Sequence, residues 1–248
     1  MSSQLKLIQL NIEFGKHIDQ TLPFFTEQQA DVVCLQELPQ HLVHKFEEVL
    51  GATSVYTPMA LYQGEVRGVG IFSKYPITKH TAEQYGGNRE KESLPVFDQS
   101  SYEARHNTSR FILLTSEIEK DAAVFHIATT HFPVTERGSV TDFQRQDMQA
   151  LLRLLKEKEE FVLTGDFNAP RGGEIFAALA AVYKDNMPQQ YKTSIDINLH
   201  RHGKTSAHEL ADKMVDGIFS TPAYQVSDVQ IISGVSDHCA FVATIAKD

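Results

Sequence analysis

Short apolar runs that stop at an acid, an amide or an imidazole are the feature that most constrains the fold of this sequence. Residues 5–10 stop at Asn11, and residues 32–35 stop just before Gln36-Glu37. Runs this short, bounded by polar residues, predict buried strands rather than helices. Because strands end at the edge of a sheet, we expect these polar side chains to meet in one pocket.

The same pattern predicts further strands over residues 53–57, 68–72, 111–118, 123–130, 161–164, 214–219, 226–232 and 239–245. Helical spacing of apolar residues predicts helices over residues 19–29, 41–50 and 140–159. Many strands with few helices, and no regular alternation between them, predict an α/β protein with a mixed-sheet sandwich rather than a doubly wound fold.

Residues 85–107 form the one long irregular stretch and are rich in glycine, serine, asparagine and charged residues. A loop of that length in a compact domain is usually functional or mobile. The sequence contains no internal repeat, low-complexity segment or linker-like run. It therefore predicts a single domain over residues 1–248.

The charge balance argues against one class of partner. Lysine and arginine total 23 and aspartate and glutamate total 32, so the formal net charge is −9. A large positive field that grips duplex DNA without sequence preference is therefore not expected, although a basic strip inside a cleft is compatible with this balance.

Targeting and redox signals point to the cytoplasm. The first apolar run alternates and is broken by Gln9 and Asn11, which predicts a strand rather than a signal peptide. No run approaches the roughly 18 apolar residues of a membrane span, so no membrane insertion is expected. Cys34 and Cys239 are too few for a disulfide framework. The oligomeric state is not predicted.

The segment Gly165-Asp166-Phe167-Asn168 carries the sharpest chemical signal. Turn chemistry after a strand accounts for part of it. It does not account for the same pairing of acid and amide in Asn11 and Glu37. Hard oxygen ligands with a histidine, and no cysteine pair, favour Mg²⁺ and a phosphate ester over zinc or a covalent nucleophile.

A histidine near the C-terminus has a candidate partner. His238 precedes an apolar run, and Asp216 stands inside another one, residues 214–219. A carboxylate buried there needs a hydrogen-bond donor. An imidazole held by Asp216 would have a fixed tautomer and raised basicity, as a general base requires. His131, which follows the run 127–130, is ambiguous when considered alone.

Taken together, these segments resemble the endonuclease/exonuclease/phosphatase superfamily, which includes deoxyribonuclease I, abasic-site endonucleases, tyrosyl-DNA phosphodiesterases, neutral sphingomyelinases, inositol-polyphosphate phosphatases and deadenylases. The resemblance extends over residues 11–238 and includes the stretch 68–77. The motifs that carry it, in chain order, are Asn11, Leu35-Gln36-Glu37, Thr130-His131-Phe132, Gly165-Asp166-Phe167-Asn168, Val215-Asp216-Gly217-Ile218-Phe219 and Ser236-Asp237-His238.

The resemblance implies a four-layer α/β sandwich, with two packed mixed β-sheets flanked by helices and the active site at one rim. It also implies a metal site. Glu37 would ligate Mg²⁺, with Mn²⁺ as the alternative ion. Asn11 would assist directly or through water, and Asp237 would support the metal. One metal or two are both compatible with the sequence.

The catalytic roles are likewise implied by the resemblance. Asp166 and Asn168 would orient the attacking water and the phosphate. His238, oriented by Asp216, would act as base or phosphate stabiliser. His131 would donate to a non-bridging oxygen, and a histidine at this position is similar to the deoxyribonuclease I, sphingomyelinase and phosphatase members rather than the abasic-site endonucleases. Whether Glu13 reaches the metal is left open.

Basic residues are the candidates for substrate binding. Arg105 and Arg89 in the irregular stretch, together with Arg145 in the helix 140–159, are the expected contacts. Solvated surface charges are the alternative for each. The basic residues gather in two clusters, Arg89, Lys91, Arg105, His106 and Arg110, and His200, Arg201, His202 and Lys204. There is no tryptophan, and the aromatic residues do not alternate with the basic ones, so the sequence gives no support for a base-stacking platform.

The leading hypothesis is a Mg²⁺-dependent phosphodiesterase that acts on nucleic acid or a related ester. A phosphomonoesterase or sphingomyelinase-like hydrolase, acting on a small molecule or a lipid head group, is the nearest rival. A catalytically silent binding module is the alternative from another class. The intact set of acids and His238 argues against that last alternative.

Overall fold

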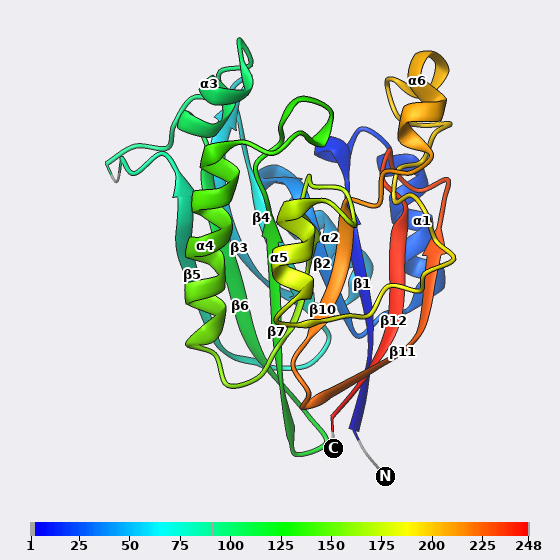
Figure 1. Cartoon of the computed structure of the whole chain (residues 1–248). Helices are drawn as coiled ribbons and strands as arrows, with labels where there is room; N and C mark the ends of the chain where they lie inside the picture. Colours follow the sequence, from blue (N-terminus) through cyan, green and yellow to red (C-terminus); the bar gives the residue numbers. More distant parts are fainter. Residues whose placement is uncertain (1–2, 91, 248) are drawn as a thin grey trace.

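The computed structural model describes residues 3–90 and 92–247, and within them the chain forms two six-stranded sheets that pack face to face (Figure 1). Both sheets are mixed, and helices cover their outer faces, as predicted. The first sheet consists, in spatial order, of β11 (Tyr224–Ile232), β12 (Ala240–Lys247), β1 (Ser3–Asn11), β2 (Val32–Pro39), β4 (Glu65–Ser73) and β3 (Thr53–Tyr62). The second sheet consists, in spatial order, of β5 (Ile77–Gly87), β6 (Arg110–Lys120), β7 (Ala123–His131), β8 (Val162–Asp166), β10 (Asp216–Ser220) and β9 (Lys184–Asp185).

Burial on both faces explains why the central strands read as nearly continuous apolar runs. In β1, Leu5 and Leu7 face the second sheet, while Ile8 and Leu10 pack under the outer helices. Strand β2 alternates in the same way and pairs with β1 in parallel. Parallel strands need cover on both sides, which the second sheet and the helices supply.

The helices form the outer layers. α1 (Ile18–Gln28) and α2 (Val43–Leu50) cover the first sheet, and α4 (Asp142–Lys156) and α5 (Glu174–Ala180) cover the second. α3 (Tyr102–Asn107) and α6 (Gly203–Leu210) stand at the end of the sandwich opposite the chain termini (Figure 1). Three short 3₁₀ turns accompany them in the described residues, η1 (Glu13–Gly15), η2 (Gln40–Leu42) and η3 (Glu136–Gly138). None of the described helices has the length and apolar character needed to cross a membrane.

Two expectations about local structure were wrong. The stretch 85–107 is not one irregular loop, because β5 runs to Gly87 and α3 begins after the Ser101 side chain, which caps it by accepting from the backbone N–H of Ala104. Strand β5 lies at a sheet edge with one face largely exposed, so its sequence lacks an apolar run. The helix predicted over 140–159 is shorter, since the Thr141 hydroxyl caps it at its start. The short elements α5, α6 and β9 were not predicted.

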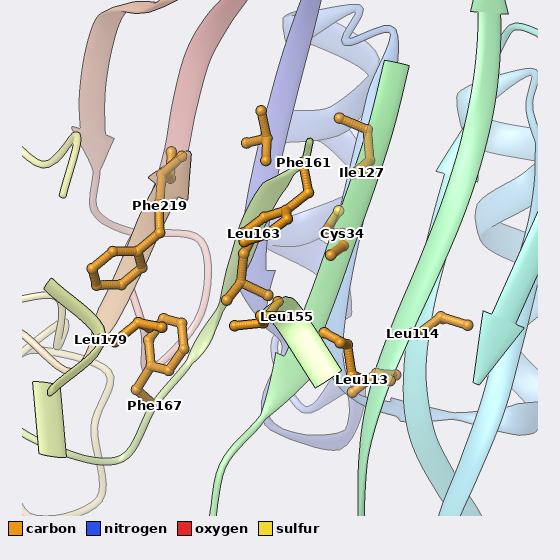
Figure 2. Close-up of a cluster of buried hydrophobic side chains, with 14 of the residues drawn as sticks. Cys34, Leu113, Leu114, Ile127, Leu155, Phe161, Leu163, Phe167, Leu179 and Phe219 are labelled. Carbon is orange, nitrogen blue, oxygen red and sulfur yellow. The ribbon is translucent and has the colours of Figure 1, made fainter. Parts of the chain in front are cut away.

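Phe219 is the centre of an aromatic cluster that supports the functional end of the second sheet (Figure 2). Its ring lies 5.3 Å from that of Phe167 and 5.1 Å from that of Phe176. We expect Phe219→Ala to lower the free energy of unfolding by about 3–5 kcal/mol, because truncation leaves a cavity in a packed core. Urea denaturation measures this. Val182→Ala, at an exposed apolar residue, is the control and should change stability by less than about 0.5 kcal/mol; a similarly small effect at Phe219 would contradict the packing described.

Candidate active site

The strand ends of both sheets converge at one rim. In the first sheet, Asn11 at the end of β1 lies beside Gln36 of β2. In the second, Asp166 at the end of β8 lies between His131 of β7 and Asp216 of β10. Pairing register alone therefore places three of the predicted site residues side by side in one sheet.

Hydrogen bonds between buried side chains join the two sets across the sandwich. The Asn11 amide donates to Asp166 Oδ2 at 3.1 Å. The Gln9 amide donates to Asp216 Oδ1 at 2.9 Å and to Gln36 Oε1 at 2.8 Å. Neither Gln9 nor Gln36 was predicted to have a role. Both are glutamines inside apolar strands, a pattern that signals a buried polar network.

The turn after β8 is shaped by its own residues. A Cβ on Gly165 would lie 2.3 Å from the Thr130 carbonyl oxygen, so only glycine lets β8 approach β7 this closely. The backbone N–H of Asn168 donates to Asp166 Oδ1 at 2.8 Å, which closes an Asx turn. Phe167, between them, points into the aromatic cluster of Figure 2.

His238 and Asp216 form the pair expected from the sequence. The distance from His238 Nδ1 to Asp216 Oδ2 is 2.7 Å, and Asp216 is fully buried. Burial acts to lower the pKa of His238, but the carboxylates of Asp216 and Asp166 outweigh it and hold that pKa well above the ordinary value. His238 is therefore a cation at neutral pH, with Nε2 3.7 Å from Asp166 Oδ2.

His131 is neutral by contrast. Burial lowers its pKa to about 4, and the positive charges of Arg67 and His238 act in the same direction. The Asn168 amide nitrogen donates to the Phe132 carbonyl at 2.9 Å and lies 3.0 Å from His131 Nε2. Nε2 is thus the acceptor in this arrangement, and the ring proton lies on Nδ1.

Carboxylates crowd the same pocket. Burial raises the pKa of Asp237 to about 7, and the nearby charges of Glu13, Glu37 and Asp166 add to the rise. Burial likewise raises the pKa of Glu37 and of Asp166. Glu13 lines the pocket, but its carboxylate is paired with Lys16 at 2.9 Å and His17 at 3.0 Å. Clustered oxygen ligands of like charge suit a hard divalent cation.

Backbone geometry directs Glu37 into this cluster. The register of β2 against β4 shifts between Leu35 and Leu38, so Glu37 lies in a bulge. Its φ is 51°, in the left-handed region that non-glycine residues rarely adopt. Bulges of this kind re-aim a side chain next to functional sites. Asn168 also has a left-handed backbone, with φ of 49°.

A second set of side chains, besides the carboxylates described above, has the spacing of metal ligands. Asp166, Asp216 and His238 offer ligand atoms within 4.8 Å of one another. However, Asp216 already accepts from Gln9 through Oδ1 and contacts His238 through Oδ2. Both carboxylate oxygens of Asp216 are therefore engaged within the protein. Glu37 and Asp237 also line the pocket.

The pocket that these groups line has a volume of about 570 Å³. Ligand sites typically measure roughly 300–1,000 Å³. Basic and acidic side chains are mixed in its lining. The lysine and arginine residues are Arg67, Arg105, Arg137, Arg201 and Lys213, and Glu136 and Glu209 join the carboxylates already described.

The three predicted substrate contacts have different positions. Arg105 lines the pocket. Arg89 is exposed and donates to the carbonyls of Gln84 and Tyr85, outside the pocket lining. Arg145 lies on the exposed face of α4, 2.7 Å from Glu174 and 2.9 Å from Asp142. The structure therefore places neither Arg89 nor Arg145 in the pocket lining.

The two predicted basic clusters contribute unequally. His106, His200, Arg201 and His202 line the pocket, whereas Lys204 and Arg110 do not. Lys91 lies outside the described residues.

Arg67 is the main site residue that the sequence did not reveal. Its guanidinium lies 3.7 Å from the ring centre of Phe97 and 5.1 Å from those of Phe14 and Tyr62. Aromatic and basic residues that do not alternate along the sequence thus meet in space. These rings come from three segments that the fold brings together. The sequence therefore shows no alternation of aromatic and basic residues that would predict this contact.

Comparison with known proteins identifies the family of this chain. The model of the Endonuclease/Exonuclease/phosphatase family matches residues 8–238. No match was found among curated proteins.

Several solved structures share the fold. An endonuclease/exonuclease/phosphatase from Bacteroides vulgatus has a TM-score of 0.72 at 17% identity, covering 99% of this chain and 100% of that one. A mannosyl-6-phosphatase from Bacteroides thetaiotaomicron has a TM-score of 0.66 at 14% identity, with coverage of 97% and 99%. The human Nocturnin catalytic domain with bound sulfate has a TM-score of 0.65 at 16% identity, with coverage of 100% and 97%.

Identities this low establish a shared architecture. The family match goes further, because it runs from β1 to His238 and so contains every strand end that meets at the rim. The chain belongs to the endonuclease/exonuclease/phosphatase family.

Proposed function

We infer that this protein is a Mg²⁺-dependent phosphoesterase that hydrolyses phosphodiester bonds, in nucleic acid or a related ester, by in-line attack of water. The observation that supports this best is the position of His238, held by Asp216 at 2.7 Å and placed 3.7 Å from Asp166. It stands among carboxylates in a pocket that arginine side chains also line. Membership of a family of nucleases and phosphatases supports the same reaction class.

The metal ligands would be Glu37 and Asp237. Burial raises the pKa of both carboxyls; nearby Glu13 and Asp166 add to the rise at Asp237, whereas the positive charges of Arg67 and His238 oppose it at Glu37. When bound, Mg²⁺ would neutralise charge that develops on the phosphoryl oxygens. Asn11 donates to Asp166 and accepts from the backbone N–H of Glu13 at 3.1 Å, so it positions both neighbours. Its role as a ligand stays a prediction.

The remaining catalytic roles belong to side chains of the protein. Asp166, whose pKa burial raises, orients the attacking water and accepts its proton. His238 is already protonated, so it stabilises charge on a non-bridging oxygen or protonates the leaving group. Of the two roles expected for His238, the structure favours phosphate stabiliser over base. The Asn168 amide, fixed by Phe132, holds the neutral His131 beside Asp166.

Phosphomonoester hydrolysis is the second candidate. The fold similarity to a mannosyl-6-phosphatase favours it, because that protein acts on a monoester by its name. The arginine residues that line the pocket would suit either kind of ester. Retention of the buried pair Asp216–His238 argues against a silent binding module, which would have no need of a buried ion pair.

A hydrolysis panel at neutral pH tests the proposal. It compares a generic phosphodiester, a phosphomonoester, single- and double-stranded DNA and sphingomyelin, each with Mg²⁺ and with EDTA. We expect EDTA-sensitive turnover of diesters that His238→Ala reduces by at least about 100-fold. Faster turnover of the monoester would favour the second candidate. Turnover that survives EDTA or His238→Ala would refute the mechanism.

A further inference from the structure

We propose that Arg67 and Arg105 form a second phosphate-binding subsite in the pocket, so that the preferred substrate carries a phosphate group besides the one that is cleaved. This rests on the proposed phosphoesterase function and specifies its substrate. The subsite lies on the side of the pocket formed by β4, α3 and the segment around Phe97.

Arg67 is held rigidly by aromatic rings. Its guanidinium stacks on Phe97 at 3.7 Å, with Phe14 and Tyr62 each 5.1 Å away. The rings also pack on one another, Phe14 with Tyr62 at 5.0 Å and Tyr62 with Phe97 at 5.7 Å. Rings that cover the planar faces leave the edge, which carries the N–H donors, available to a ligand.

The N–H groups of Arg67 have no acceptor in the described part of the chain. No hydrogen bond forms, and no carboxylate lies within 4.0 Å, although the side chain is only partly exposed. Glu37 influences it at longer range. A guanidinium that rings partly cover and that no carboxylate of the described residues pairs with is available to an anion from outside the chain.

Arg105 is a second guanidinium of the same kind. It lies 4.8 Å from the ring centre of Tyr102, and its Nε is buried without a hydrogen-bond partner. Its Nη2 makes one long contact, 3.5 Å to the carbonyl of Gln99. Arg105 lies close enough to Arg67 to disfavour its charge. Two like charges near one another, neither within 4.0 Å of a described carboxylate, are the arrangement expected around a shared anion.

α3 holds Arg105 in place. The neighbouring His106 contacts the buried Asp147 at 2.8 Å and stacks on Phe143 at 4.4 Å and Phe111 at 5.4 Å. This anchor ties a six-residue helix to α4. The subsite is therefore prearranged and does not need a mobile loop to close.

Phosphate is the anion that fits this pair. Two guanidinium forks offer paired N–H donors and two positive charges, which match a phosphate better than a single carboxylate. The face of Phe97 is already covered by Arg67, so stacking of a base on that face is not its use. Arg67 and Glu37 line the same pocket, so one substrate can reach both the catalytic groups and the subsite.

The second phosphate could come from two sources, a terminal phosphate on a small ester or the neighbouring linkage of a nucleic acid strand. Four thymidine probes separate them. One is a dinucleotide with a single internal phosphate, two carry an added terminal phosphate at one end or the other, and the last is a trinucleotide with two internal phosphates. Calorimetric titration with Mg²⁺ in the Asp166→Asn background measures affinity without turnover.

We expect at least one two-phosphate probe to bind roughly 10- to 100-fold more tightly than the single-phosphate dinucleotide. Arg67→Gln and Arg105→Gln should each remove most of that difference. Arg153→Gln, the same change at an exposed residue of α4, should retain it. Thermal denaturation shows whether each variant folds, and either arginine variant alone suffices for the test.

Equal affinity for all four probes, binding of none, or a preference unchanged in both arginine variants would overturn the subsite. Preference for the terminal phosphates alone identifies a small ester, and preference for the trinucleotide identifies a strand. Turnover of bis(4-nitrophenyl) phosphate by the unmodified protein reports the catalytic centre separately. Its absence would count against the proposed function, whereas its presence without a two-phosphate preference would count against the subsite alone.

Discussion

Asp166→Asn is expected to lower kcat by about 10²–10⁴-fold while the protein becomes no less stable. The catalytic loss follows because the amide cannot accept the proton of the attacking water. The stability follows from electrostatics. Burial, and then the neighbouring Asp216, raise the pKa of Asp166, so folding makes the carboxylate form that the mechanism needs more costly than it is in the unfolded chain. Removal of that charge relieves the repulsion, and the amide oxygen still accepts from Asn168 or Asn11.

Steady-state kinetics and thermal denaturation of the same preparation test both halves of this prediction. Asp212→Asn is the matched control, because Asp212 is exposed and undergoes the same chemical change. It should alter neither kcat nor the midpoint of unfolding. Near-normal turnover by Asp166→Asn would remove Asp166 from the mechanism. A large fall in Tm would show instead that its charge has a structural role.

Divalent metal is expected to raise Tm as well as to support turnover. Glu37, Asp237 and Asp166 are crowded carboxylates, so a cation that binds only the folded state relieves their repulsion. At a Mg²⁺ concentration about 100 times the dissociation constant, the stabilisation is about 2.7 kcal/mol. For a chain of this size that corresponds to a rise in Tm of about 5–10 °C.

Differential scanning calorimetry of the EDTA-treated protein, titrated with Mg²⁺ and in parallel with Mn²⁺, measures the effect without any substrate. Glu37→Gln and Asp237→Asn should each reduce the rise, whereas Asp212→Asn should preserve it. A metal-independent Tm would argue against the cation site. A rise that persists unchanged in both site variants would move the site elsewhere.

The central strands and the polar side chains that meet at the rim could be predicted from the sequence because the same pattern indicates both. Strands β1 and β2 are buried on both faces, so they appear as apolar runs, and the polar residue that ends each run marks the rim. The buried Asp216 could be recognised for a related reason. A charge inside an apolar run is costly unless a partner is present, and His238 is that partner.

The rest of the site was hidden because it depends on three-dimensional neighbours. Arg67 is an ordinary arginine in an edge-side strand until Phe14, Tyr62 and Phe97 surround it. Arg145 shows the reverse case. It was suggested by resemblance alone, and its place on the outer face of α4, paired with Glu174, removes it from the pocket. Edge strand β5 was not predicted, because its exposed residues are polar and it therefore lacks an apolar run.

The left-handed backbone at Glu37 and Asn168 has a consequence for how this protein can evolve. A non-glycine residue in that region costs roughly 1–3 kcal/mol, and glycine would adopt it freely. Selection for heat resistance alone would therefore favour glycine at Glu37, and less strongly at Asn168 because asparagine tolerates this region, and each such change would delete a side chain of the proposed site. Thermostable variants selected without a screen for activity should accumulate these glycine substitutions. Enrichment of glycine at the two positions would then locate the proposed active site without any assay of its substrate.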